Sequence, residues 1–151
     1  KMSLSEKINN DIKEAMKAKD NVALAAIRSI KSAILLEETK GGDAQVDDTK
    51  VVQIIQKLLK QRKDSAALYQ EQGREDLVNE EMEQAAIIEK YLPQQLSANE
   101  IKEVVLQAIQ STGATSAKDM GKVMGVVSKA LAGKADNKLV ADVVKDTLAQ
   151  L

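Results

Sequence analysis

Apolar residues recur every three or four positions along nearly the whole chain of 151 residues. Near the C-terminus this spacing places Val123, Val126, Val127, Ala130 and Leu131 on one side of a helix. No stretch alternates apolar and polar residues as a half-buried strand would, and no turn dipeptide separates two such stretches. The sequence therefore predicts an all-α fold, with these five residues on the core face of their helix.

Capping residues and glycines divide the pattern into seven predicted helices. Ser or Asp at a helix start accepts a hydrogen bond from the first turn, and glycine at a helix end adopts the left-handed backbone at little cost. Ser3 with Glu6 and Ser97 with Glu100 have the spacing of a capping box. The expected helices begin at Ser3, Asp20, Asp48, Arg74, Ser97, Ser116 and Asp136, with residues 41–48 as a polar loop and with ends at Lys40, Gly73, Tyr91, Gly113 and Gly133.

Pro93 is the only proline, and it marks a boundary. Proline fits poorly inside a helix, and it also disfavours the helical backbone at the residue before it. We therefore expect two domains: an N-terminal helical domain of about four helices over residues 1–94, and a C-terminal three-helix bundle over residues 95–151.

The composition excludes much of the usual catalytic chemistry. The chain has no cysteine and no histidine, which excludes disulfides, thiolate nucleophiles, Cys or His zinc sites and Ser-His-Asp triads. Phe and Trp are absent, and two Tyr leave little for base stacking. We expect no catalytic residue, no metal site and no cofactor, so the chain is more readily a binding protein than an enzyme.

Charge and hydropathy bear on partners and location. The 22 basic and 23 acidic residues give a net charge of −1, so no overall positive field attracts nucleic acid. No apolar run approaches the roughly 20 residues of a membrane span, and we expect no membrane partner. The first residues lack the apolar core of a signal peptide, which predicts a cytoplasmic protein.

Gly121 and Gly125 are the most informative local feature. They lie four residues apart, on one face of a predicted helix, and each costs about 1 kcal/mol relative to alanine there. Close packing against another helix would explain them, and so would close approach of a ligand such as an RNA phosphate. The physics alone favours packing. Gly133 precedes Lys134, but Ser128 stands where a phosphate-binding loop needs its first glycine, so we expect Gly133 to end a helix.

Two charged segments have ordinary explanations. The carboxylates within residues 80–83 do not converge on one ion, because adjacent positions on a helix point apart. The basic residues within 60–63 could contact phosphates, but local ion pairs such as Lys60 with Asp64 are the more common outcome. Neither segment indicates a specific site.

Four segments carry a resemblance to a known family. They are KQRKDS at residues 60–65, GREDL at 73–77, YLPQQLS at 91–97 and GKVMGVVSKALAGKADNKLV at 121–140. The last segment resembles the C-terminal helical domain of the B subunit of the tRNA-dependent amidotransferase. Together the four resemble the free-standing YqeY family, which shares that domain, over essentially the whole chain.

The resemblance implies a bacterial protein related to tRNA amidation that lacks both catalytic centres of the amidotransferase. It suggests tRNA, or a protein of the translation or aminoacylation machinery, as partner. The positions that it suggests for RNA contact are Lys122, Lys129, Lys134 and Lys138, with Gly121, Gly125 and Gly133 as sites of close approach. Amidotransferase tails often have Asn-Pro where this chain has Asp136-Asn137, which favours the free-standing family. An Asp136 side chain capping the last helix would also occupy backbone donors that phosphate would need.

Three hypotheses follow. The first is a cytoplasmic accessory protein that binds tRNA without catalysis. The second is a protein-binding module that does not bind RNA, which the near-neutral charge suits. The third is a component of a glutamine-dependent carbon–nitrogen ligase system.

Overall fold

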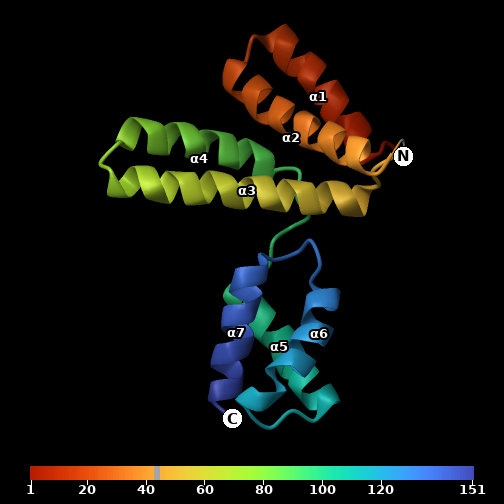
Figure 1. Ribbon diagram of the computed structural model, residues 1–151, viewed down its shortest axis with the longest axis vertical. Coiled ribbons are helices and arrows are strands. Elements are labelled where there is room, and N and C mark those ends of the chain that lie inside the picture. The colour runs from red at the N-terminus through yellow and green to blue at the C-terminus, as the bar shows by residue number, and fades with distance from the viewer. Residues whose placement is uncertain (43–44) are drawn as a thin grey trace. The chain divides into compact units, whose positions relative to one another are not determined.

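A computed structural model describes residues 1–42 and 45–151, and its regular elements are all helices (Figure 1). The prediction of an all-α fold is thus confirmed for this part of the chain. The predicted loop over 41–48 includes residues 43 and 44, which lie outside the described residues.

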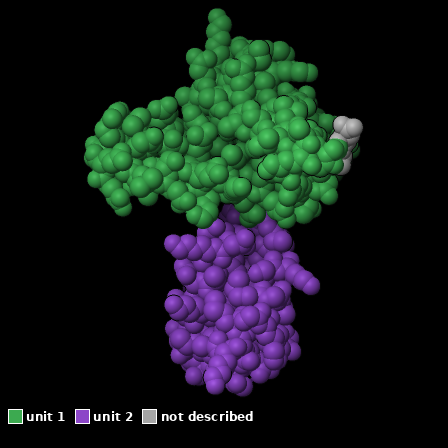
Figure 2. Space-filling model, viewed as in Figure 1, with its two compact units in different colours: residues 1–92 green, residues 93–151 purple. Residues whose placement is uncertain are grey.

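The helices fall into two compact units, residues 1–92 and residues 93–151 (Figure 2). The first unit contains α1 (Leu4–Ala18), α2 (Asn21–Lys40), α3 (Asp48–Glu71) and α4 (Glu75–Glu89). The second contains α5 (Ala98–Thr112), the short 3₁₀ helix η1 (Ala117–Asp119), α6 (Met120–Ala130) and α7 (Asn137–Ala149). Each unit has an apolar core of its own.

Isoleucines from all four helices fill the core of the first unit. Ile8 of α1, Ile30 of α2, Ile55 of α3 and Ile88 of α4 are fully buried. Long α3 and α4 run side by side (Figure 1). Arg62 of α3 and Glu81 of α4 form an ion pair of 3.4 Å between them.

Side-chain caps start several helices where the sequence predicts. The Ser3 hydroxyl accepts from the Glu6 N–H, and the Asp20 carboxylate accepts from the Ala23 N–H. Ser97 and Glu100 form a full capping box at α5. The cap of α3 is Asp47, one residue before the predicted start.

The end of α4 differs from the prediction. The helix stops at Glu89, two residues before Tyr91. The N–H groups of Tyr91 and Leu92 bond to carbonyls only three residues back, in a tightened last turn. Pro93 favours this ending, because it has no N–H to donate to the Glu89 carbonyl four residues back and its ring disfavours the α conformation at Leu92.

Helix α6 presents a narrower core face than the sequence predicts. Val123 and Val127 are fully buried, in contact with α5 and α7, as expected. Val126 is 43% exposed and Ala130 is also exposed, so their assignment to the core is wrong. Val126 lies about 60° from Val123 around the helix, on the side away from Val127, which turns it toward solvent. Ala130 is the last residue of α6, where the helix ends.

Candidate functional site

The exposed side of α6 has a bare backbone at Gly121 and Gly125. Both glycines are solvent-exposed. A Cβ atom built on either one would have no neighbour within 4 Å among the described residues outside its local backbone. Close packing against another helix of this chain therefore does not explain the two glycines in the described structure.

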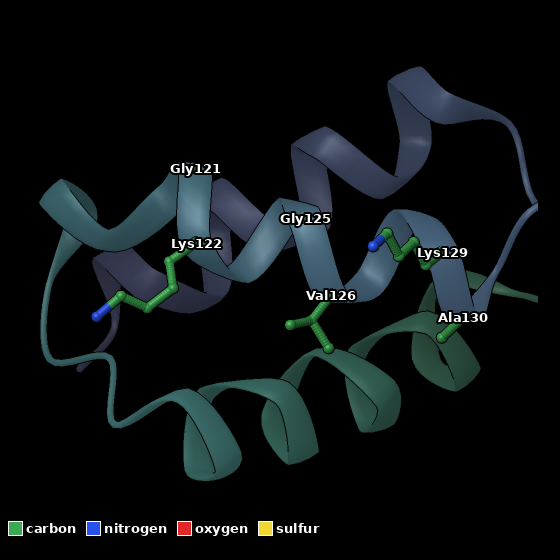
Figure 3. Close-up of a pocket in the computed structure, with 6 residues that line it drawn as sticks. All are labelled: Gly121, Lys122, Gly125, Val126, Lys129 and Ala130. Carbon is green, nitrogen blue, oxygen red and sulfur yellow. The ribbon is translucent and has the colours of Figure 1, made fainter.

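An open depression lies over this backbone (Figure 3). We call its lining the α6 open face. In Figure 3 the side chains of Lys122 and Lys129 leave α6 toward either end of the depression, with Val126 between them on the side of α5. The α6 open face consists of Gly121, Lys122, Gly125, Val126, Lys129 and Ala130.

Lys122 and Lys129 are the only charged side chains of the α6 open face. Seven residues bring an α-helix round to within about 20° of its starting direction and rise about 10 Å along the axis, so the two lysines share one line. Neither forms an ion pair in the described part of the chain. Both ammonium groups are thus free to pair with a ligand.

The carboxylate of Asp119 interacts electrostatically with Lys122, but its hydrogen bonds are made at the start of η1. Its carboxylate accepts from the Thr115 N–H at 2.8 Å and from the Ser116 N–H, at the start of η1. The hydrogen bond from Thr115, and more weakly the charge of Lys122, hold the pKa of Asp119 below its ordinary value. Asp119 thus stays ionised as a cap and does not reach ion-pairing distance of Lys122.

The other two predicted lysines lie outside the α6 open face. Lys134 is in the turn after α6, and Lys138 is in the first turn of α7; both are exposed. The backbone of Lys134 is fixed, since its N–H donates to the Leu131 carbonyl and its own carbonyl accepts from the Leu96 N–H. The structure thus groups Lys122 with Lys129 in one depression and leaves Lys134 and Lys138 out of it.

Gly133 has a different role from the two glycines of α6. Its φ of 78° is left-handed, a conformation that glycine adopts readily and other residues do not. Its carbonyl accepts from the Gln95 amide at 3.0 Å. This turn conformation accounts for the glycine without a ligand.

The predicted cap at α7 is wrong in one respect. Asp136 occupies the N-cap position, but its side chain accepts no capping hydrogen bond. The side chain of Asp136 therefore does not occupy the first-turn N–H groups of α7. The backbone of Asp136 lies at ψ 132°, and Lys138 follows in the open first turn.

The two other charged segments form ion pairs within this chain. Lys60 pairs with Asp64 at 2.8 Å, as predicted, and Arg62 reaches across to Glu81. No cluster of three or more acidic side chains that could hold a metal ion occurs in the described ranges.

Sequence reasoning missed Val126 and Ala130 as lining residues. Their apolar character and helical spacing had assigned them to the core. For Val126 one signal pointed the other way: it is one helical turn from both Lys122 and Lys129, which mark the solvent side of α6. No such signal marked Ala130.

Comparison with known proteins shows relatives over most of the chain. A family model described as "Yqey-like protein" matches residues 5–148. "Altered inheritance of mitochondria protein 41, mitochondrial" of Kluyveromyces lactis is 38% identical over 84 residues, which cover 56% of this chain and 45% of that protein. The protein of the same name from Clavispora lusitaniae is 37% identical over 117 residues, covering 76% of this chain and 68% of that protein. In Saccharomyces cerevisiae it is 30% identical over 125 residues, covering 80% and 68%.

These relatives correct part of the sequence-based account. They are mitochondrial proteins of yeasts, which contradicts the predicted bacterial origin and cytoplasmic location. Their shared name refers to inheritance of mitochondria and not to tRNA, and the prediction of a cytoplasmic tRNA-binding accessory protein is wrong. The matched part spans about half the length of the Kluyveromyces lactis relative.

The described helices do not include one with both the length and the apolar character needed to cross a membrane.

The family match runs from α1 to the last turn of α7 and includes the whole α6 open face. The chain belongs to the YqeY family.

Proposed function

We propose that this YqeY protein binds a helix of a partner protein on the α6 open face. The observation that carries the proposal is the bare backbone at Gly121 and Gly125, which no other described element covers. Each glycine lowers the stability of α6 by about 1 kcal/mol relative to alanine. The reduced stability is explained if a partner backbone occupies the space that two Cβ atoms would otherwise fill.

The geometry suits a rod-shaped partner. Gly121 and Gly125 are one helical turn apart, so together they leave a strip of backbone open along the axis of α6. Helices normally pack with their axes 8–10 Å apart, and small residues at the crossing point allow the closest approach. Val126 and Ala130 add apolar surface to the same open face, on the other side of the line that joins Lys122 and Lys129.

The lining suits protein better than nucleic acid. None of the six lining residues is aromatic, so the face offers no platform for an unpaired base. Two lysines would neutralise two phosphates, and binding through so few contacts is weak at physiological salt.

Site-specific photo-crosslinking tests this proposal. A photoreactive amino acid replaces Val126 in the full-length protein, and the cross-linked product is identified by mass spectrometry after irradiation in cells. We expect a protein adduct that disappears when Gly125→Leu fills the open face. The control substitution Gln110→Leu, at an exposed position of α5, should leave the adduct intact. An adduct that is RNA, or that survives Gly125→Leu, would contradict the proposal.

A mitochondrial location is the second part of the proposal. It rests on the printed names of relatives that are 30–38% identical to this chain. Fractionation of cells that express the full-length protein from its own gene tests it. Recovery with mitochondrial markers is expected, and recovery only with cytosolic markers would contradict it.

We also propose that the two units are independently folding domains of four helices and three helices. The two core clusters share no residue, which supports the division. A fragment of residues 93–151 should give a helical circular dichroism spectrum and a cooperative thermal transition. A fragment without such a transition would contradict this part.

A further inference from the structure

We infer that the partner helix is acidic, with a small residue at its crossing point and two carboxylates about two turns apart. This inference rests on the proposed function and adds the chemistry of the partner. It is carried by the positions of Lys122 and Lys129 relative to the bare backbone.

The two lysines bracket the place where a partner helix would touch. They lie about 10 Å apart along α6, and both Gly125 and Val126 fall between them along the axis. Gly125 is on one side of the line that joins the lysines and Val126 is on the other (Figure 3). A small apolar residue of the partner fits between the lysines, and carboxylates seven residues apart on the partner match their separation.

Charge decides among possible partner helices. Neither lysine has a carboxylate within ion-pairing distance in the described part of the chain. Docking a neutral or basic helix would take both ammonium groups partly out of water without a counter-charge, which is costly. An acidic helix avoids this cost and pairs with both lysines.

Charge also disfavours a second copy of this chain as the partner. Two α6 open faces in contact would bring Lys122 and Lys129 of one copy against the same lysines of the other. Like charges placed face to face across an interface repel, in either helix direction. The surface thus favours a different protein over self-association.

Two synthetic helical peptides provide the test. Both are alanine-based with one central glycine. The first carries glutamates seven residues apart, and the matched control carries lysines at those two positions. Each is titrated into the ¹⁵N-labelled full-length chain. We expect the amide signals of Gly121 and Gly125 to shift with the glutamate peptide and to stay unchanged with the lysine peptide.

Charge-reversal variants give the expected size of the effect. Lys122→Glu and Lys129→Glu should each weaken binding of the glutamate peptide about two- to fivefold, as exposed ion pairs do. Lys145→Glu, an equal charge change at an exposed position of α7 outside the face, should change the affinity by less. Raising the salt concentration should weaken binding to the wild-type chain.

The outcomes separate the inference from the proposed function. A glutamate peptide that leaves both glycine signals unmoved contradicts the acidic partner, and the crosslinking result then decides the proposed function by itself. A short RNA hairpin that moves the same signals at lower concentration than the glutamate peptide would also overturn the inference, because the face would then recognise phosphate. If Gly125→Leu neither blocks the crosslink nor alters peptide binding, both claims fail.

Discussion

The phenolic hydroxyl of Tyr91 donates a hydrogen bond of 2.5 Å to the carboxylate of Asp11, 80 residues earlier. The same carboxylate pairs with Lys7 at 3.1 Å, and the Lys7 ammonium lies 5.5 Å from the centre of the Tyr91 ring. This cluster ties the end of the first unit to α1. Since the hydrogen bond depends on the Tyr91 hydroxyl, a single substitution of Tyr91 tests its contribution.

Tyr91→Phe should lower the free energy of unfolding of the first unit by about 1 kcal/mol, since it removes the hydrogen bond and keeps the ring. Asp11 keeps Lys7 as a partner, which limits the loss. Urea unfolding of both proteins at pH 7 measures the difference. Equal midpoints would show that the hydrogen bond contributes nothing to stability.

The same pair predicts a loss of stability at high pH. Burial, and then the hydrogen bond to Asp11, raise the pKa of Tyr91 above its ordinary value of about 10. The folded state thus favours the protonated phenol, and this stabilisation is complete below pH 10 and is lost as the pH rises through the folded-state pKa. The wild-type chain should lose more stability than Tyr91→Phe between pH 9 and pH 11.5. Both proteins have the same lysines, so the titration of lysine cancels in this comparison. If the free energies of unfolding of the two proteins fell in parallel with pH, this linkage would be contradicted.

Glycines of the second unit should respond to alanine in opposite directions. Gly125→Ala should raise the unfolding free energy by up to about 1 kcal/mol, because its Cβ enters open space in a helix. Gly133→Ala should lower it by about 1–2 kcal/mol, because alanine is strained at a φ of 78°. Thermal unfolding of the two variants distinguishes these results. A loss of stability in Gly125→Ala would mean that the face is already packed.

The capping box of α5 predicts a separate dependence on low pH. Hydrogen bonds from the backbone and side chain of Ser97 hold the pKa of Glu100 below its ordinary value. Because the pKa of Glu100 is lower in the folded state, its ionised carboxylate stabilises the fold at pH values above the unfolded-state pKa of about 4.3. This stabilisation is lost as the pH falls through the folded-state pKa. The unfolding midpoint should therefore drop more steeply below pH 4.5 in the wild type than in Glu100→Gln. Ser97→Ala should itself cost about 1 kcal/mol at pH 7.

Local signals in the sequence predicted much of the fold. The side chains of Ser97 and Asp20 each accept a hydrogen bond from the N–H three residues later, so these caps could be recognised without any tertiary contact. Gly73 and Gly113 likewise end their helices with φ values of 71° and 72°. Such features depend on neighbours in the chain, which is why they were predictable.

Features set by the packing of whole helices were harder to predict. Val126 fits an apolar repeat, yet the contacts of Val123 and Val127 turn it toward solvent. The glycine pair of α6 fits either tight packing or an open face, and only the positions of the neighbouring helices distinguish these alternatives. The cap at Asp136 depends on a side-chain rotamer that no sequence pattern specifies. Location in the cell was predicted wrongly because composition carries little information about it.

The variant Gly125→Leu tests most directly whether the backbone at Gly121 and Gly125 is left bare for a partner. One preparation of this variant is used for two measurements, thermal unfolding and crosslinking from position 126. We predict an unfolding midpoint equal to or above that of the wild type, because leucine favours helix and the space is open, together with loss of the protein adduct. An unchanged adduct in a stably folded variant would contradict the account.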